Sequence, residues 1–440
     1  MSAPSAPSAP SAPYAPSAPI TFAGESPHLT LRRRTLPSGL EVVLHADPSS
    51  PNVAVSVWYR AGSSDERPER TGLAHLFEHL FKNSQHMTAK HYEVLRTAGA
   101  SDANASTGGD RTAYHEVVPA DQLALALWLE SDRMGYWAPC IDEARLATQQ
   151  SVVRAERRQR YEDVAYGAER FAVAAALYPD GDPRRHLTIG LHDHIQAATV
   201  DDLLAWYRTW YVPANATLVI AGDFDDAQCD ALVDQYFGSF PASTRPARPQ
   251  PVAPPPAAAQ ILIPDRFAVL PRIHRAWPGP AAFAADEAEL DVLTTAWCAV
   301  GSGALWRRLV YDTQLAQRVS AWASSTRLGG EIHVAIDLRT GADPVRARAI
   351  LDEELARGID EPQLRRVLTR REAGAIWSLS GIGRRAQMLQ RYNLYTGEPD
   401  GLAPELARYR AVTPAGIEAA RARWLDPAQQ IEVETVPARA

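Results

Sequence analysis

Hydrophobic and polar residues alternate early in the chain in the manner of half-buried strands. Residues 40–45 and 53–59 form two such runs. The segment 47–51 between them contains two prolines, two serines and an aspartate. Because these are typical turn residues, we expect the two runs to pair as a hairpin.

Longer segments follow the spacing of helices instead. Apolar residues recur at intervals of three and four in residues 72–83, 120–134, 141–161 and 200–211. Strands mixed with helices, rather than alternating strictly with them, predict an α+β fold in which helices pack on mixed sheets.

The two halves of the chain end in a similar way. Residues 210–220 start with Trp, followed three and four positions later by Pro and Ala, and lead into an apolar run. Residues 424–433 repeat this order. We therefore expect two homologous α/β-layer domains that arose by duplication.

Two proline-rich segments divide the chain. Residues 1–19 repeat Ser-Ala-Pro around Tyr14 and predict a disordered tail over residues 1–24. Residues 241–258 predict an extended linker, because proline rings block helix formation. The predicted domains are residues 25–240 and 259–440, since 440 residues exceed the roughly 250 to 300 of a single core.

Composition excludes several classes of protein. The 45 basic and 52 acidic residues are spread along the chain, so we expect no nucleic-acid partner. No apolar run approaches the roughly 18 residues of a membrane span. Three cysteines without CxxC spacing exclude a disulfide framework and a cysteine zinc ribbon. No secretory signal is visible, so we expect a cytoplasmic location, with the periplasm as the alternative.

The most specific motif is HxxEH at His75, Glu78 and His79. At about 100° per residue, His79 lies about 40° around a helix from His75, and Glu78 lies about 60° the other way. All three side chains therefore share one face. Two imidazoles one turn apart can bind one Zn²⁺ ion, and a catalytic site then needs one more protein ligand. The intervening carboxylate is free to transfer protons, as in inverzincins.

The third ligand is suggested by a resemblance. Glu156 lies on a predicted helix with 76 residues between it and His79. The HxxEH motif followed at this distance by Glu resembles the pitrilysin (M16) family of metallopeptidases, which includes insulin-degrading enzyme and mitochondrial processing peptidase. The resemblance extends over nearly the whole chain after the tail, including residues 61–66, 104–114 and 211–215.

The resemblance implies roles for these residues. His75, His79 and Glu156 would hold Zn²⁺, and Glu78 would take a proton from water and return it to the leaving amine. The family often has a glutamate seven residues before the third ligand, where this chain has Gln149. An amide can support a ligand imidazole but lacks the charge that raises its basicity, so we expect moderately weaker zinc binding.

The substrate site is also predicted from the resemblance. Residues 101–114 would include a strand edge that pairs with an extended peptide through main-chain hydrogen bonds. We expect Asn104 and Ala105 to make these contacts, with a turn position as the alternative for Asn104.

Other charged residues receive simpler interpretations. We expect Arg157, Arg158 and Arg160 to form a solvated helix face near the third ligand, with contact to the substrate as the alternative. We expect His186 to be a surface or core histidine rather than a metal ligand.

The second half departs from the family. Members typically have an arginine and, seven residues later, a tyrosine that bind the substrate backbone and the oxyanion. This chain has Val310 and Gln317 there, and a valine side chain cannot donate a hydrogen bond. Single-chain members close four related domains around the substrate, whereas this chain has two, half of a clamshell. We expect a heterodimer with a similar subunit that keeps the pair. Tyr311 or Arg318 could substitute, which leaves a homodimer open.

The favoured function is therefore a zinc endopeptidase subunit that hydrolyses small or unfolded peptides. Two alternatives remain open. One is a protease that removes leader or targeting peptides. The other is a non-catalytic homologue like the core subunits of respiratory complexes, although the intact motif argues against it.

Overall fold

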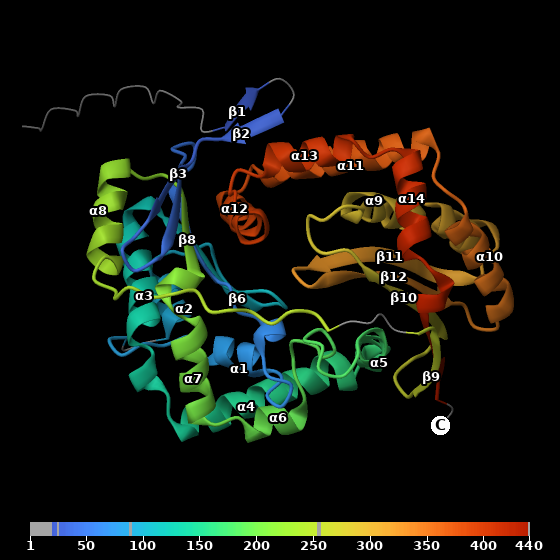
Figure 1. Ribbon diagram of the computed structural model, residues 1–440, viewed down its shortest axis with the longest axis horizontal. Helices are drawn as coiled ribbons and strands as arrows, with labels where there is room; N and C mark the ends of the chain where they lie inside the picture. Colours follow the sequence, from blue (N-terminus) through green and yellow to red (C-terminus); the bar gives the residue numbers. More distant parts are fainter. Residues whose placement is uncertain (1–19, 24–25, 88–89, 253–256, 439–440) are drawn as a thin grey trace, which may run out of the picture.

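The computed structural model describes residues 20–23, 26–87, 90–252 and 257–438, which form two α/β units (Figure 1). Each unit is a mixed sheet with helices packed on it, so the predicted α+β fold with two related domains is confirmed. Residues 1–19 of the predicted tail lie outside the described residues. Residues 20–23, also predicted to be disordered, instead form β1 (Ile20–Ala23), which pairs with β2 (Ser26–Leu29).

The N-terminal unit contains a six-stranded sheet. Its strands, in spatial order, are β3 (Arg32–Thr35), β4 (Glu41–Ala46), β8 (Ala216–Gly222), β5 (Asn52–Tyr59), β7 (Thr112–Pro119) and β6 (Asp102–Thr107). Only the β4–β8 pair is parallel. The predicted hairpin is wrong, because β8 lies between β4 and β5. All seven residues of β8 are buried, as a central strand covered on both faces requires.

The C-terminal unit repeats this arrangement with five strands. In spatial order these are β11 (Ala316–Thr326), β12 (Gly329–Leu338), β10 (Arg272–Gly279), β13 (Ile431–Pro437) and β9 (Ala259–Asp265). The β9–β13 pair is parallel and the others are antiparallel. Thus β4, β8, β5, β7 and β6 correspond in order to β9, β13, β10, β12 and β11, as a duplicated domain predicts.

Helices cover both sheets. In the N-terminal half they are α1 (Leu73–Leu80), α2 (His91–Thr97), α3 (Leu123–Tyr136), α4 (Glu143–Arg157), α5 (Gly167–Leu177), α6 (His192–Ala197), α7 (Val200–Trp210) and α8 (Asp226–Phe237). In the C-terminal half they are α9 (Glu287–Cys298), α10 (Pro344–Ala356), α11 (Glu361–Ser378), α12 (Ile382–Thr396), α13 (Leu402–Arg410) and α14 (Pro414–Trp424).

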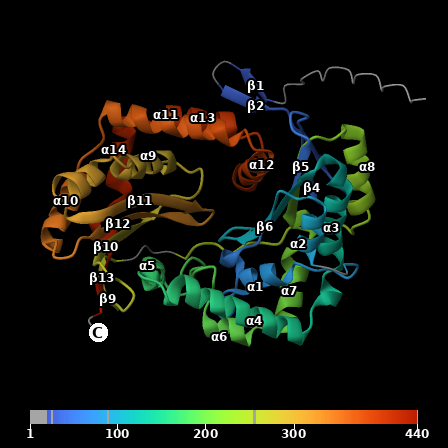
Figure 2. The ribbon, with the colours of Figure 1, turned by 180° about the vertical axis from the view of Figure 1, so that it is seen from behind.

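The two halves exchange helices. Helix α12 comes from the C-terminal half, but Ala386 and Leu389 pack against Ala54 and Val219 of the N-terminal sheet. Helix α5 makes the reverse contact with the C-terminal sheet. Figures 1 and 2 show α12 beside the N-terminal unit and α5 next to the C-terminal one. The exchange holds the two units together around the space between them.

The segment that joins the units is anchored to the first. The Arg248 guanidinium donates to the Asp65 carboxylate at 2.8 and 2.6 Å and to the Asp110 carbonyl at 2.8 Å. Residues 253–256 of the predicted linker lie outside the described residues. Within the described part of the chain, no helix has the length and apolar character needed to span a membrane.

Candidate metal centre

The HxxEH motif lies on α1, whose orientation is fixed by burial. Leu76 and Phe77 are fully buried in the N-terminal core. The helical period therefore turns His75, Glu78 and His79 together towards α4 and β6. The shared face predicted from the sequence is present in the structure.

A buried carboxylate holds the start of α1. Gly72 precedes the helix with φ of 87°, and a Cβ there would lie 2.9 Å from the Gly190 Cα atom. Glu66 accepts hydrogen bonds from the N–H groups of Gly72 and Ala74 at 2.9 and 2.7 Å. His186 contacts Glu66 at 2.9 Å. Burial opposes protonation of His186, but its hydrogen bond to Glu66 raises its pKa overall. His186 therefore belongs to the helix cap and not to the metal-ligating group.

Helix α4 contributes Glu156. The Asp142 side chain accepts the Arg145 N–H at 2.7 Å and caps the start of the helix. Directly after α4 the chain forms a π-helical turn, Arg158–Glu162. Such turns are often found at functional sites, because they change the direction in which neighbouring side chains point. Glu156 lies in the last α-helical turn before this change.

The arginines around Glu156 differ in exposure. Arg157 is buried, and its Nε donates to Glu162 at 2.8 Å, so the predicted solvated position is wrong. The reason is that the Arg157 guanidinium packs over the Phe171 ring at 4.3 Å and donates to the Gly190 carbonyl, while the more exposed Glu162 carboxylate balances its charge. Arg158 and Arg160 are exposed, as predicted. Arg160 pairs with Glu156 Oε1 at 3.0 Å.

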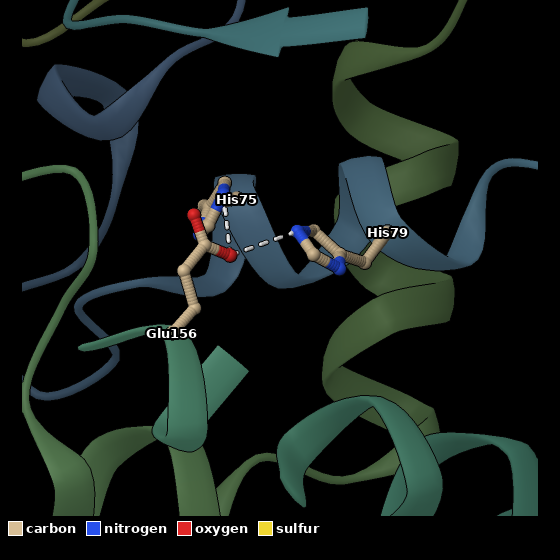
Figure 3. A group of neighbouring side chains, drawn as sticks. All are labelled: His75, His79 and Glu156. Carbon is tan, nitrogen blue, oxygen red and sulfur yellow. Dashed lines mark ion pairs between the residues drawn. The ribbon is translucent and has the colours of Figure 1, made fainter. Parts of the chain in front are cut away.

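The three predicted ligands meet in the structure (Figure 3). Glu156 Oε2 lies 3.8 Å from His75 Nε2 and 3.4 Å from His79 Nε2. One ligand atom from each residue lies within 4.8 Å of the other two. The imidazole ring centroids are 4.7 Å apart. Folding thus brings Glu156 to the paired imidazoles from a different helix.

The protonation of the two histidines suits a metal. Burial, assisted by the charges of Arg160 and Lys82, lowers the pKa of His75 to about 4. Burial and the neighbouring His75 lower the pKa of His79 to about 4. Both rings are therefore neutral near pH 7, which is the form that binds metal. Two neutral imidazoles and one carboxylate are a donor set that fits Zn²⁺.

Two further side chains support this cluster. The Glu78 carboxylate accepts a hydrogen bond from the Thr107 hydroxyl at 2.7 Å, and burial raises its pKa despite that bond. The Gln149 side chain interacts with the His79 ring and opposes the lowering of the His79 pKa. Gln149 thus lies where a residue that orients a ligand imidazole belongs.

The predicted substrate residues lie on β6, which is an edge strand of the N-terminal sheet. Asn104 and Ala105 are therefore strand residues, and the alternative turn position for Asn104 is wrong. The Asn104 side-chain oxygen accepts the Ala105 N–H at 2.9 Å. Thr107 at the end of the same strand contacts Glu78, so this edge leads directly to the cluster.

Two domain models of one protein family match the sequence. "Insulinase (Peptidase family M16)" matches residues 41–170, which include His75, His79 and Glu156. "Peptidase M16 inactive domain" matches residues 197–366. The chain belongs to peptidase family M16.

Individual M16 relatives agree with this assignment. An uncharacterised zinc protease of Streptomyces coelicolor is 25% identical over 415 residues, which cover 90% of this chain and 87% of that protein. A protease from Helicobacter pylori has the same fold, with a TM-score of 0.84 and 23% identity over 93% of this chain and 99% of that one. The periplasmic protease PqqL from Escherichia coli has a TM-score of 0.73 and 19% identity, covering 92% of this chain but 47% of that one.

The second M16 unit does not supply the pair expected from the family. Val310 lies in a π-helical turn, Trp306–Asp312, and packs against the C-terminal core. Gln317 is exposed at an irregularity of β11. Tyr311 and Arg318, the possible substitutes, are also exposed.

Three supporting contacts were missed by the sequence reasoning. Glu66 caps α1 from a loop, and Thr107 reaches Glu78 from a strand, so no local spacing marks either contact. Arg160 was assigned to a solvated face or to substrate contact, and not to a pair with Glu156. Its spacing of four residues from Glu156 was the available signal, because such pairs are neighbours on a helix.

Proposed function

We propose that this chain is a zinc-dependent endopeptidase subunit that hydrolyses small or unfolded peptides. The observation that carries the proposal is the convergence of His75, His79 and Glu156, with the buried carboxylate of Glu78 on the same helix face. Membership of the M16 family supports the same activity.

The chemistry divides between the ion and the protein. When bound, Zn²⁺ supplies the Lewis acidity that makes hydroxide available near neutral pH and polarises a peptide carbonyl. Glu78 accepts the proton of the attacking water and passes it to the leaving amine. The Thr107 hydroxyl orients the carboxylate through the 2.7 Å hydrogen bond. Gln149 orients the His79 ring.

The edge strand β6 explains how peptides of different sequence could bind. A substrate in extended conformation would add to this edge through main-chain hydrogen bonds, which do not depend on side chains. Asn104 and Ala105 would make these contacts, and the Asn104 side chain must then leave the Ala105 N–H that it now occupies. Folded substrates lack a free extended segment and would be excluded.

A second subunit would complete the enzyme. The chain has two units and spans about half of the Escherichia coli protease, and it lacks the arginine and tyrosine at Val310 and Gln317. We propose a heterodimer with a similar subunit that carries this pair. Affinity purification from the native source tests this proposal, since a related subunit should co-purify. Full peptidase activity of this chain alone would contradict it.

Metal analysis and peptide cleavage together test the proposed activity. The purified chain should contain close to one zinc ion. With its co-purified subunit it should cleave an unstructured peptide library, lose this activity with a chelator, and regain it with zinc. The His79→Ala variant should bind little zinc, while His28→Ala, on the partly exposed β2, should bind normally. Zinc binding without cleavage of any peptide would instead favour a non-catalytic homologue.

A further inference from the structure

A cavity of about 670 Å³ lies between the two halves, on the side of β6 away from α1. Trp58 and Arg111 contribute from the N-terminal sheet, and most other lining residues come from α11, α12 and α13. Figure 1 shows β6 between α12 and α1, so the two helices lie on opposite sides of this edge. A peptide bound along the β6 edge would therefore have α1 on one side and this cavity on the other.

The charges of this cavity are unbalanced. Five arginines line it, but only two glutamates do so. Three of these arginines already pair with a carboxylate: Arg391 lies 3.7 Å from Glu405, Arg371 pairs with Asp291, and Arg410 pairs with Glu372. Arg370 forms no hydrogen bond or ion pair with any described residue. The cavity thus carries an excess of positive charge, although apolar side chains such as Met388 and Leu406 form much of its walls.

Arg111 connects the cavity to the β6 edge. Its guanidinium lies over the Trp58 ring at 4.4 Å. Its Nη1 donates to the Ser106 carbonyl at 2.9 Å and to the Ser106 hydroxyl at 2.8 Å. In the described chain, Nε and Nη2 have no partner, and no carboxylate lies within ion-pair distance of this arginine. A guanidinium with free donors in a partly closed site favours a carboxylate, which can accept two parallel hydrogen bonds.

Strand geometry decides which substrate side chains would reach the cavity. Ser106 pairs with Ala113, which pairs with Trp58, so these residues share the face of the sheet that bears the cavity. Thr107 is the next residue, and its side chain points to the other face, where it meets Glu78. In a peptide added to β6, neighbouring side chains must alternate in the same way. One of the two residues at the cleaved bond would then point away from α1 and towards Arg111.

We infer that this cavity is a specificity subsite for an acidic side chain at or next to the cleaved bond of the peptide. The inference rests on the proposed peptidase function and adds a substrate class to it. Arg111 would bind the carboxylate, Arg370 would add positive charge, and Trp58 would hold the Arg111 guanidinium in place. Peptides with lysine at this position would be disfavoured because the cavity is already positively charged.

Matched peptides test this inference. The peptides are acetylated and amidated, so that the only carboxylate varied is the side chain, and they differ only by Glu, Gln or Lys at one residue beside the cleaved bond. With the active zinc-loaded complex, kcat/KM for Glu should exceed that for Gln by about 10-fold or more. In Arg111→Gln this ratio should fall to about one, and Arg111→Lys should keep part of it. The ratio is taken within each variant, so a general loss of activity does not change it.

The control is Arg366→Gln on α11, an exposed arginine outside this cavity, which should keep the full preference. An equal rate for Glu and Gln in the wild-type complex, or the same preference in Arg111→Gln, overturns the subsite while leaving the peptidase intact. If no peptide is cleaved, the proposed function fails, and calorimetric titration of the same peptides still decides the subsite. Tighter binding of the Glu peptide that disappears in Arg111→Gln supports it, and equal binding of Glu and Gln overturns it.

Discussion

Glu78 and Glu156 are the same residue type in different surroundings. Glu156 has one oxygen near the two imidazoles and the other paired with Arg160 at 3.0 Å. Glu78 is buried beside a neutral hydroxyl, and burial raises its pKa towards the range in which a carboxyl can both accept and release a proton. The environment thus suits one carboxylate to ligation and the other to proton transfer.

The Glu78→Gln variant should separate these two roles. The amide keeps the shape of the side chain but cannot accept a proton from water, so kcat should fall by about 100-fold or more. Zinc content, measured by atomic emission, should stay at the wild-type value because Glu78 is not a proposed ligand. Glu93→Gln, an exposed glutamate on α2, should retain both properties. Loss of zinc together with activity would contradict the assignment.

Gln149 permits a second test at the level of a single residue. Gln149→Glu would place a charge beside the His79 ring and raise the basicity of this ligand. Zinc affinity should therefore increase, by about 10-fold, as partners of ligand imidazoles typically affect it. Competition with a chromophoric chelator measures the affinity, and Gln228→Glu on the surface of α8 is the matched control. An affinity equal to or below that of the wild type would reject the prediction.

The sequence predicted single residues where spacing carries the information. His75 and His79 share a face because of the helical period alone. The position of Glu156 came from the resemblance, since nothing local shows that a helix 76 residues later packs against the first. The contacts of Glu66 and Thr107 depend on tertiary structure and could not be predicted.

Helices and strands, like single residues, could be predicted only where the signal is local in the sequence. The four predicted helical ranges, all in the N-terminal half, lie close to α1, α3, α4 and α7, because periodic burial is a local property. The hairpin of β4 and β5 was wrong, since β8 from the end of the unit enters between them. Alternation identifies a strand but not its neighbours, which are chosen by burial across the whole sheet.

The cap of α1 fixes the start of the helix that carries His75, Glu78 and His79. Glu66 is buried, and it satisfies two N–H groups at the start of the helix and pairs with His186. Glu66→Ala would leave these three groups without their partner in a buried site. The free energy of unfolding should fall by about 3 kcal/mol or more.

Thermal or denaturant unfolding of the zinc-free chain measures this loss without a contribution from the metal. Glu69→Ala, an exposed glutamate in the same loop, is the control and should change stability by less than about 0.5 kcal/mol. A wild-type stability in Glu66→Ala would mean that water replaces the carboxylate and that the cap does not fix α1.

At the scale of the whole molecule, the hydrophobic core is not divided at the point where the sequence divides into two halves. The proline-rich segment marks the point where the chain passes between halves. The hydrophobic clusters do not follow that division, because α12 covers the N-terminal sheet and α5 contacts the C-terminal one. Duplication explains the repeated strand order, whereas the helix exchange joins the two copies. Composition along the chain contains no signal for such an exchange.

The exchange predicts that the halves cannot fold well apart. A fragment of residues 26–252 would lack α12 and expose the sheet face that bears Ala54 and Val219, so it should aggregate or unfold at low denaturant concentration. Co-expression with residues 257–438 should restore a soluble one-to-one complex, measured by size-exclusion chromatography with light scattering.

Substitutions in α12 test whether its packing on the N-terminal sheet is the cause of this rescue. Leu389→Asp in the second fragment places a charge in the fully buried contact and should abolish the complex, because loss of such a leucine costs about 3 kcal/mol or more. Ile376→Asp on α11 alters a partly exposed residue outside the clusters and should leave the complex intact. If the fragment of residues 26–252 is monomeric and unfolds cooperatively by itself, the N-terminal sheet does not need α12 to cover it. The arrangement of the two halves would then depend on docking of two independent domains rather than on a shared core.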